Sequence, residues 1–576
     1  MTVSENLVAA LSNSGVKQVF GITGDAINYV VKAISQHPEM EWVPMRHEGN
    51  AAFAAFAQGE LSGLGVCAGT VGPGSLHLIN GLYNAKKERS PVIVISGQVE
   101  TCKRGRDFFQ EVDLQKAFDE VCEYQAIIRE PSEAGYLIQR AIHTALSRRC
   151  VCRIEVARDL ANVATDGLKQ TSAIPNFDLS PIQEELQKTV YWLNRLGRVT
   201  ILAGAGCREA REEVLILAQK LKAPIVHTLR SADIFDHEAE AVVGLTGLIG
   251  IPSAYKAIMN CELLLMLGTD FPYDEYLPDN VKTIQVDIRM ENIGNRLPVD
   301  IGLQANVKTT VQKINELVQP KGPSKFYEQH TQAFNEWKSS AIDQFMDEKA
   351  EKLLHPQTIA AQLNEIAADD AIFVLETSTA AIWAARHISF SKNRRLIGSF
   401  NHGSMAVGLP AAIGAQKAFP GREVWALSGD GGFGMSMQDL ITASNESLPV
   451  KVIVFNNASL QLIDLEMENE GEKPDLKATH LNNPDFAAYA RLCGGEGEQV
   501  AGAAESGPAL KRAKASSSPF VLNALVSSGE IPMPPHLSVK DALTLTKTKL
   551  KQTFAGIKGQ KSQFEYMKSQ LEAMIR

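Results

Sequence analysis

The chain has 576 residues, of which 45% are hydrophobic, and a formal net charge of −9 at pH 7. It is too long for a single hydrophobic core, so about three domains are expected. Acidic and basic residues are interleaved, which argues against a nucleic-acid partner, and no long uncharged apolar run predicts a transmembrane helix.

The N-terminal segment and the eight cysteines both predict a cytoplasmic protein. Residues 1–16 lack a basic region before their apolar residues and predict an amphipathic helix, not a signal peptide. Only Cys150 and Cys152 lie close together, in a strand-like run where they would share a face. Because a metal site normally needs a second pair, buried free thiols in a reducing compartment are the favoured interpretation.

Residues 1–165 alternate helical and strand patterns and predict a first α/β domain. Residues 91–97 form its clearest buried strand, since an apolar run is bounded there by breakers. Glu48 follows an apolar strand and precedes an alanine-rich helix, and a carboxylate beside such a surface is suited to proton transfer. A plain carboxylate at a helix start, favoured by the helix dipole, is the alternative.

Residues 180–325 repeat the alternation and predict a second α/β domain. Gly204 and Gly206 follow a strand as in dinucleotide sites, but the third glycine of that fingerprint is missing. Asp287 ends a strand, where its carboxylate is placed to accept hydrogen bonds from ribose or ribityl hydroxyls. Residues 326–352 carry mixed charges and predict a helical linker.

Residues 353–530 predict a third domain, and the functional prediction depends on one stretch within it. An apolar strand leads to a turn at residues 428–432, a helix-like segment covers residues 435–447, and a β-branched strand ends at Asn456 and Asn457. The turn contains Gly429, Gly431 and Gly432. Glycines let the backbone approach an anion closely and a helix start offers free N–H groups, so the turn suits a diphosphate.

Asp430 and Asn457 follow neighbouring strands of this predicted parallel sheet. Carboxyl ends of parallel strands meet at one edge, so the two side chains can converge on one cation. With a main-chain carbonyl near Ser459 and diphosphate oxygens, they would supply the octahedral oxygen shell that Mg²⁺ prefers. The pattern therefore predicts a magnesium–diphosphate site.

The Gly-Asp-Gly turn, followed after a helix and a strand by Asn-Asn, resembles the signature of thiamine-diphosphate enzymes. Nearly the whole chain is similar to the pyruvate oxidase family, most closely to its quinone-reducing, membrane-associated branch, including the segment RRLIGSFNHGSMA at 394–406. The resemblance implies three doubly wound parallel-sheet domains that bind pyrimidine, FAD and diphosphate in turn. It also implies thiamine diphosphate, Mg²⁺ and FAD as cofactors, and a homo-oligomer, expected to be a tetramer.

The resemblance further implies roles for single residues. Glu48 would be the activating glutamate, which hydrogen-bonds the pyrimidine ring of the cofactor and normally comes from the neighbouring subunit. Phe109 would form an apolar wall and Gln110 a polar contact for the substrate, although Phe109 could equally be an ordinary core residue. Gly403 would orient the amino group of the cofactor through its carbonyl, and Met405 would be a wedge that bends the cofactor, not a plain core methionine. The adjoining residues expected to contact the cofactor are Ala406, Val407 and Leu460.

Three blocks of the middle domain resemble the flavin-binding segments of the family. Their residues are Thr246, Gly247, Leu248 and Ile249, then Thr269, Asp270, Phe271, Pro272 and Tyr273, then Asp287. A middle domain that keeps the fold without flavin is the alternative.

Two positions depart from the family pattern. Glu376-Thr377-Ser378 replaces Asp-Val-Gly, and Leu462 replaces a phenylalanine that lies near both cofactors, while Glu466 keeps its place. Leu462 and Glu466 are expected beside the reacting groups. The departures at Glu376-Thr377-Ser378 and Leu462 put the rate of electron transfer and the substrate preference in doubt. Residues 467–485 are polar without a period and predict a mobile loop.

Residues 531–576 predict an amphipathic tail, with Phe564, Met567 and Leu571 on one helical face. It could dock on the protein or lie on the cytoplasmic face of the membrane, and the resemblance favours the membrane. The implied reaction is oxidation of pyruvate to acetate and CO₂, with electrons passed through FAD to a membrane quinone. The alternatives are a phosphate- and oxygen-dependent pyruvate oxidase, a carboligase of the acetolactate synthase type, and a scaffold without turnover.

Overall fold

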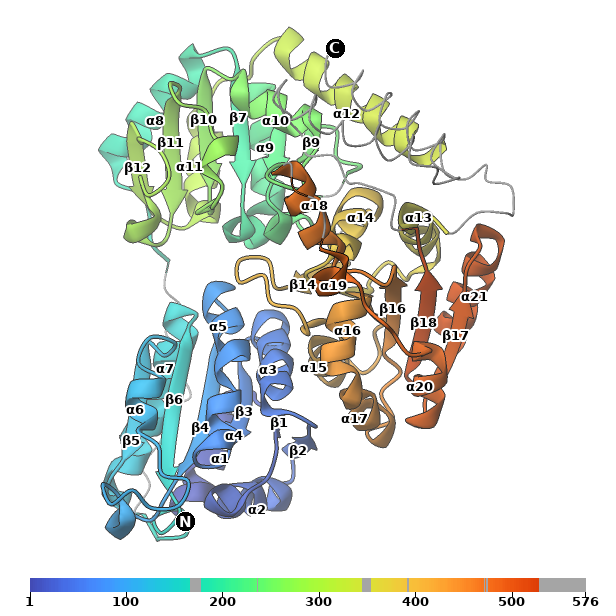
Figure 1. Ribbon diagram of the computed structural model, residues 1–576. Helices are drawn as coiled ribbons and strands as arrows, with labels where there is room; N and C mark the ends of the chain where they lie inside the picture. The colour runs from blue at the N-terminus through green and yellow to red at the C-terminus, as the bar shows by residue number, and fades with distance from the viewer. Residues whose placement is uncertain are drawn as a thin grey trace.

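The computed structural model describes residues 1–165, 178–235, 237–343, 354–390, 393–470, 472 and 475–527. Three six-stranded sheets follow one another along this part of the chain, and every strand pair in them is parallel (Figure 1). Helices cover both faces of the sheets. The prediction of three doubly wound parallel-sheet domains is therefore confirmed.

The first unit contains the sheet with strand order β2-β1-β3-β4-β6-β5. Its strands are β1 (Gln18–Gly21), β2 (Glu41–Pro44), β3 (Gly65–Gly69), β4 (Val92–Gln98), β5 (Tyr124–Ile128) and β6 (Val151–Ala157). Its helices are α1 (Val3–Asn13), α2 (Asn28–Gln36), α3 (Glu48–Ser62), α4 (Pro73–His77), α5 (Ile79–Lys87), α6 (Leu114–Ala117) and α7 (Ala134–Arg148). Strands β4 and β6 are buried at every position, as expected for central strands of a covered parallel sheet.

The middle unit has the strand order β12-β11-β10-β7-β8-β9. Its strands are β7 (Val199–Ala203), β8 (Ile225–His227), β9 (Val242–Leu245), β10 (Leu263–Leu267), β11 (Lys282–Asp287) and β12 (Ile301–Gln304). Its helices are α8 (Gln183–Arg195), α9 (Arg211–Leu221), α10 (Pro252–Met259), α11 (Val307–Leu317) and α12 (Lys325–Asp343), the last of which falls in the predicted linker.

The third unit has the strand order β14-β13-β15-β16-β18-β17. Its strands are β13 (Ile372–Leu375), β14 (Arg395–Gly398), β15 (Val424–Gly429), β16 (Lys451–Asn456), β17 (Glu496–Val500) and β18 (Phe520–Leu525). Its helices are α13 (Pro356–Ile366), α14 (Thr379–His387), α15 (Gly408–Ala418), α16 (Asp430–Ser436), α17 (Leu440–Asn445), α18 (Gln461–Asn469), α19 (Leu476–Thr479), α20 (Phe486–Leu492) and α21 (Ala503–Ala515).

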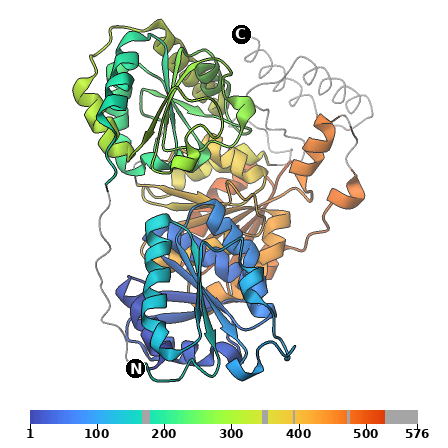
Figure 2. The ribbon, with the colours of Figure 1, turned by 90° about the vertical axis from the view of Figure 1, so that its left-hand side faces the viewer.

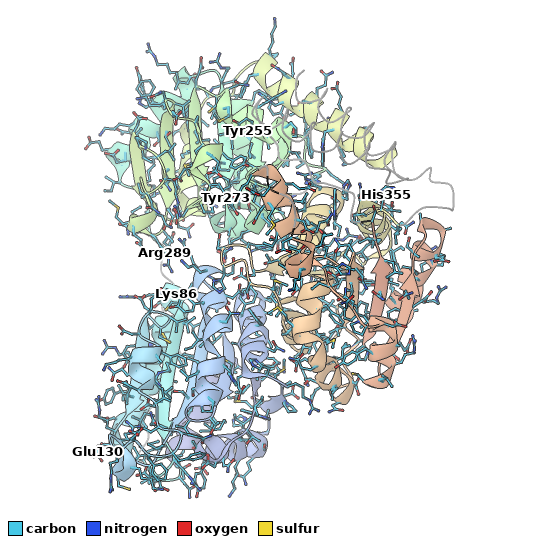
Figure 3. All side chains as sticks on the ribbon, in the orientation of Figure 1. Lys86, Glu130, Tyr255, Tyr273, Arg289 and His355 are labelled. Carbon is cyan, nitrogen blue, oxygen red and sulfur yellow. The ribbon has the colours of Figure 1, made fainter. Side chains whose placement is uncertain are left out.

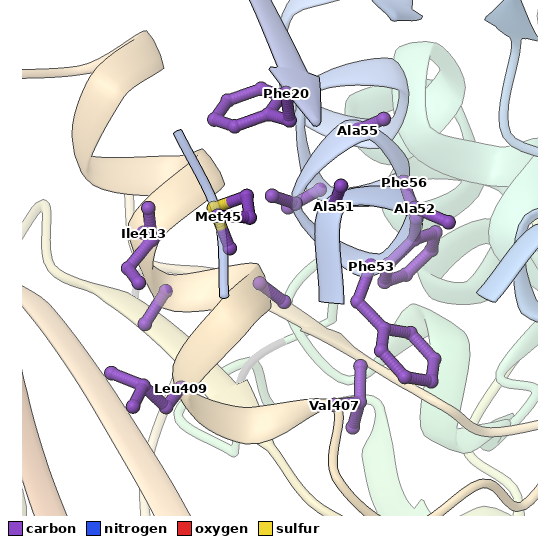
Figure 4. Close-up of a cluster of buried hydrophobic side chains, with 14 of the residues drawn as sticks. Phe20, Met45, Ala51, Ala52, Phe53, Ala55, Phe56, Val407, Leu409 and Ile413 are labelled. Carbon is purple, nitrogen blue, oxygen red and sulfur yellow. The ribbon is translucent and has the colours of Figure 1, made fainter. Parts of the chain in front are cut away.

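The first and third units share one hydrophobic core through helices α3 and α15 (Figure 4). The two backbones touch, because an added Cβ at Gly414 would lie 2.2 Å from the carbonyl oxygen of Ala54. Buried Phe53 and Ile413 belong to the same cluster from opposite sides. Figure 2 shows the middle unit stacked above this pair, so the first and third units meet beneath it.

The structure also tests two smaller predictions. The sulfur atoms of Cys150 and Cys152 lie 3.9 Å apart, as expected for residues on one face of a strand, and five of the eight cysteines are buried free thiols. No described helix is long and apolar enough to cross a membrane. The predicted tail at 531–576 lies outside the described residues.

Candidate active site

The neighbouring strands β15 and β16 bring Asp430 and Asn457 to one edge of the third sheet. Gly429 pairs with Phe455, so both strands end at the same level. Asp430 directly follows β15, and its Oδ2 accepts the backbone N–H of Ala458 at 2.7 Å, in the turn that follows β16. Burial raises the pKa of the Asp430 carboxyl above its ordinary value. A buried carboxylate of this kind is well placed to gain from a bound cation.

Asn457 and Ser459 lie in the same turn after β16. The Oδ1 atom of Asn457 accepts the backbone N–H of Ser459 at 3.1 Å, and its Nδ2 donates to Oε1 of Gln461 at 2.7 Å. The side-chain oxygen of Asn457 therefore faces the backbone of its own turn, and the side-chain nitrogen faces the start of α18. Carboxylate and amide oxygens are the donors that Mg²⁺ prefers, so the residues present fit that ion.

The glycine-rich turn differs from its prediction. A helix was expected from residue 435 to 447, but α16 begins at Asp430, with no intervening turn, and a 3₁₀ segment, η8 (Met437–Asp439), separates it from α17. The prediction was wrong because glycines were interpreted as turn formers, whereas here they allow close packing. An added Cβ at Gly431 would lie 2.8 Å from Leu460 and 3.2 Å from Met405. At the predicted diphosphate position, the glycine run therefore lies in close contact with side chains of the third unit.

Glu376 lies directly beneath this glycine run. An added Cβ at Gly432 would lie 2.3 Å from its carboxyl carbon, and its Oε1 accepts the backbone N–H of Ala406 at 2.5 Å. Burial raises the pKa of Glu376 to about 7. Ala406 has a φ of +73°, a left-handed conformation that this hydrogen bond helps to hold. Glu376 thus links the glycine run to the segment 403–407.

Gly403 also adopts a left-handed conformation, with a φ of +68°, in this segment. Met405 approaches Gly431 through its terminal methyl group, and Val407 is fully buried. Met405, which was predicted to bend the cofactor, therefore lies against the glycine run. Ser378, one of the departures from the family pattern, packs against Gly429, where an added Cβ would lie 2.8 Å from its own Cβ.

Asn483 is a site residue that the sequence did not reveal. Its Nδ2 donates to Oδ2 of Asp430 at 2.8 Å and to Oδ1 of Asn456 at 3.0 Å. It lies in the stretch 467–485 that was predicted to be a mobile loop. The end of α18 and the short helix α19 fall within that stretch, and Asn483 follows α19 outside any helix or strand. The only sequence signal was the Asn-Asn-Pro-Asp run at 482–485, which is typical of a turn.

Glu48 is the first residue of α3 and is 7% exposed. Its Oε2 lies 2.9 Å from Nδ1 of His77, and an added Cβ at Gly74 would lie 3.1 Å from its Oε1. The rings of His47 and His77 are stacked with centroids 4.7 Å apart. These three side chains could present metal ligands within 4.8 Å of one another, but Nδ1 of His47 already accepts the N–H of Gly49 at the start of the helix.

The predicted substrate residues of the first unit lie close to this carboxylate. An added Cβ at Gly72 would lie 2.5 Å from the carbonyl oxygen of Gln110, so the loop carrying Phe109 and Gln110 rests on the turn beside Glu48. Gln110 has a φ of +62°. Phe109 is 78% exposed, so the alternative of a core phenylalanine is wrong for the single chain.

Leu462 and Glu466 lie one turn apart on α18 and therefore on one face of that helix. Leu462 is half-buried and Glu466 is exposed. Helix α18 starts four residues after Asn457, so both side chains are carried by the element that follows the turn predicted to bind the metal.

The predicted flavin blocks come together at the carboxyl ends of the middle strands. Gly247 has a φ of +96° and packs against Phe271 and Tyr273, with an added Cβ 3.2 Å and 3.4 Å from their rings. Asp287 ends β11, and its Oδ1 accepts hydrogen bonds from the backbone N–H of Arg289 and from Nδ2 of Asn292. Figure 3 places Tyr273 and Arg289 on the side of the middle unit that faces the other two units.

The other residues of these blocks fall into three environments. Thr246 and Thr269 are buried, and Leu248 is 55% exposed. Asp270 accepts a hydrogen bond from Nε of Arg296 at 3.1 Å. Pro272 is exposed and lies between Phe271 and Tyr273 in the sequence.

Ile249 connects the flavin blocks to the third unit. Nε of Arg386, on α14, donates to the carbonyl oxygen of Ile249 at 3.1 Å, and its Nη2 donates to that of Gly250 at 3.0 Å. The Gly-x-Gly turn, in contrast, is filled by the protein itself, because an added Cβ at Gly206 would lie 2.7 Å from Cα of Gly268. Those glycines therefore allow two strand ends to pack closely.

Comparisons with known proteins agree with this geometry. Residues 1–118, 186–314 and 376–524 match the N-terminal TPP binding domain, the central domain and the C-terminal TPP binding domain of the thiamine pyrophosphate enzymes. The chain is 34% identical over 578 aligned residues to YdaP of Bacillus subtilis, which is named as thiamine pyrophosphate-containing, and the match covers 100% of this chain and 99% of that protein.

Two further relatives have named activities. Pyruvate oxidase of Lactiplantibacillus plantarum is 29% identical, covering 84% of this chain and 81% of that protein. The acetolactate synthase large subunit of Corynebacterium glutamicum is 27% identical, covering 89% of this chain and 85% of that protein.

Proposed function

We propose that this chain, which belongs to the thiamine pyrophosphate enzyme family, oxidises pyruvate to acetate and CO₂ and passes the electrons through FAD to a membrane quinone. Thiamine pyrophosphate is the thiamine diphosphate of the sequence prediction. One observation supports the proposal most directly: Asp430, the turn at Asn457 and the glycine run 429–432 lie together at the carboxyl edge of the third sheet. This is where parallel sheets bind their ligands.

The residues of the third unit would hold the diphosphate end of the cofactor. Asp430, Asn457 and the carbonyl of Ser459 would bind Mg²⁺, which neutralises the diphosphate. Met405 and Leu460, which flank Gly431, would support the cofactor from the apolar side. When bound, thiamine diphosphate supplies the carbanion chemistry by which 2-oxo acids lose CO₂.

The residues of the first unit would complete the reaction site. Glu48 would form a hydrogen bond with the pyrimidine ring, and its burial excludes the water that would otherwise solvate it. Phe109 and Gln110 are close to Glu48 in the same unit, and the exposed ring of Phe109 is free to meet a second subunit. A homo-oligomer, expected to be a tetramer, would cover that surface.

Support for FAD comes from the middle unit. The predicted blocks meet at one edge, and Asp287 at the end of β11 offers a buried carboxylate for sugar hydroxyls. Burial raises the pKa of the Asp287 carboxyl, as removal from water does for any acid. Arg386 fixes the backbone at Ile249 to the third unit, which would keep the flavin in register with the thiamine cofactor.

The oxidation also needs an electron acceptor, and quinone is the proposed one. Each pyruvate and one water give acetate, CO₂, two electrons and two protons, which reduce one quinone to a quinol. The tail at 531–576 would bring the protein to the cytoplasmic face of the membrane. Pyruvate oxidase and acetolactate synthase relatives favour two rivals, an oxygen- and phosphate-dependent oxidase and a carboligase.

An anaerobic spectrum of the purified protein tests the proposal. With thiamine diphosphate and Mg²⁺ present, pyruvate should bleach the flavin, and quinone in liposomes should restore the yellow colour. Acetyl phosphate with peroxide release identifies the first rival, and acetoin after acid treatment identifies the second. Protein that contains no flavin, or flavin that pyruvate leaves oxidised, excludes the proposed reaction.

Glu48→Gln supplies the residue-level test in the same assay. The amide keeps the shape of the side chain but loses the charge that would stabilise the pyrimidine contact, so bleaching should slow by about 100-fold or more. Bleaching at the wild-type rate would remove Glu48 from the proposed reaction.

A further inference from the structure

The start of helix α3 is held by a carboxylate from another unit of the chain. Asp439 ends the 3₁₀ segment η8, and its side chain is fully buried. Its Oδ1 accepts the backbone N–H of Arg46 at 2.7 Å, and its Oδ2 accepts a short hydrogen bond from Nδ2 of Asn50. These partners lie two residues before and two residues after Glu48. One carboxylate therefore brackets the position of Glu48 from both sides.

A second side chain from the third unit supports the same segment. The hydroxyl of Thr442, on α17, lies 2.9 Å from the carbonyl oxygen of Pro44 and 3.1 Å from Oδ1 of Asp439. Further along α3, the contact between Ala54 and Gly414 fixes the helix against α15. These contacts at Pro44 and Ala54 therefore limit the movement of the start of α3 relative to the third unit.

We propose that Asp439 is a positioning residue for Glu48, which it aims at the pyrimidine ring of thiamine diphosphate by fixing the backbone on both sides. The inference rests on the role of Glu48 in the proposed function. Asp439 acts through hydrogen bonds to Arg46 and Asn50 and does not itself touch the cofactor. Without it, the contact with His77 and the packing of Thr442 and α15 would remain, but the hydrogen bonds from the third unit to Arg46 and Asn50, on either side of Glu48, would be lost.

The position of Asp439 in the chain gives the arrangement a further consequence. Helix α16 starts at Asp430, and η8 continues it directly to Asp439. The same helical run therefore carries the predicted metal-binding carboxylate at its start and the residue that holds the Glu48 segment at its end. A displacement of one end changes the position of the other within the same chain.

Asp439→Asn tests the proposal with a minimal change of shape. The asparagine can still accept the N–H of Arg46, but its amide group then faces the amide of Asn50, so two donors oppose each other. The measurement is the rate at which the C2 proton of bound thiamine diphosphate exchanges into D₂O. Exchange should slow at least about tenfold, because small misplacements of a catalytic group cost one to two orders of magnitude, while the Kd for thiamine diphosphate with Mg²⁺ should change less than about threefold.

The paired variant Asn50→Asp with Asp439→Asn distinguishes the positioning of Glu48 from a general loss of stability. It exchanges donor and acceptor across the contact, so the exchange rate should return to within about threefold of wild type. A merely structural role predicts no selective recovery. Slow exchange in the paired variant, or wild-type exchange in Asp439→Asn, overturns the positioning role.

Asp233→Asn is a matched control. Asp233 is also a buried carboxylate between units, accepting from Nη2 of Arg208 at 2.9 Å and from the N–H of Leu396 at 3.1 Å, but it forms no hydrogen bond or ion pair with a described residue of α3. This variant should lower the melting temperature without slowing C2 exchange. A parallel slowing would show that any lost contact between units has the same effect, and the proposal would then fail.

Two further variants make every outcome decisive. Glu48→Gln sets the floor of the exchange rate; if it exchanges as fast as wild type, Glu48 has no such role and the proposed function and this inference fail together. If Glu48→Gln is slow and Asp439→Asn is not, only the inference fails. If Asp439→Asn does not fold, Thr442→Val replaces it, because the hydroxyl of Thr442 contacts both Asp439 and Pro44. C2-proton exchange about threefold slower than in wild type then supports the proposal, and an unchanged rate overturns it.

Discussion

Replacing Gly432 with alanine tests the packing beneath the predicted diphosphate site. The new Cβ would lie 2.3 Å from Cδ and Oε1 of Glu376, whereas ordinary contacts begin at 3.4 Å. One of the two groups must therefore move by about 1 Å. Glu376 cannot move freely, because it is 1% exposed and holds the N–H of Ala406. The strain is transmitted to Met405, the predicted wedge.

Overpacking of this kind costs about 1–3 kcal/mol, partly offset in the folded protein by the roughly 1 kcal/mol that alanine gains over glycine in a helix. If this overpacking strain of about 1–3 kcal/mol destabilises only the cofactor-bound state, the Kd for thiamine diphosphate rises about 5- to 150-fold. Isothermal titration with Mg²⁺ present measures this directly. Gly434→Ala is the control, since its Cβ meets nothing within 4 Å in the same helix, and it should bind normally and melt slightly higher.

Glu376→Asp should rescue the alanine variant. The shorter side chain withdraws the carboxyl group from the new methyl group, so Gly432→Ala combined with Glu376→Asp should recover most of the lost affinity. Binding within twofold of wild type for Gly432→Ala alone would refute the reasoning, because it would show that the start of α16 can shift without affecting cofactor binding. Failure of the rescue would show that the carboxylate is not the obstacle.

Two other predictions concern metal affinity and acid stability. Asn483→Ala removes the hydrogen bond to Oδ2 of Asp430, so the Mg²⁺ concentration for half-maximal cofactor binding should rise about tenfold, as for other residues that orient a metal ligand; an unchanged requirement would contradict this. Burial lowers the pKa of His227 to about 4, so between pH 6.5 and 4 the unfolded chain binds a proton that the folded protein does not, and folding stability is lost as the pH falls. His227→Gln should flatten the drop in urea stability between pH 7 and 5 by roughly 2 kcal/mol relative to wild type, and equal slopes would exclude this histidine as a cause.

The sequence alone was sufficient for the fold class and for the order of the strands that end at the site. Apolar runs bounded by glycine and proline set the strands, and parallel connections force consecutive strand ends to one edge. For that reason Asp430 and Asn457 could be predicted to converge without a structure. The family resemblance added the expected roles of Glu48 and Met405, which the residues by themselves left open.

Other features of the site were not accessible from the sequence, because they depend on contacts between residues far apart along the chain. Asn483 looked like part of a loop, and only folding brings its amide to Asp430. Asp439 looked like a polar helix residue, and its partners Arg46 and Asn50 lie nearly 400 residues away.

Local sequence patterns therefore determined the strands, the glycine run and the chemistry of the predicted metal ligands, since these depend on neighbours in the chain and on side-chain type. The tertiary structure alone decided where the helix after β15 begins, how Glu376 is buried beneath Gly432 and which carboxylate holds the start of α3. The physical reason is that burial and hydrogen-bond partners are set by the packing of whole units against one another. The residue pattern within one segment does not predict which group from a distant part of the chain will pack against it.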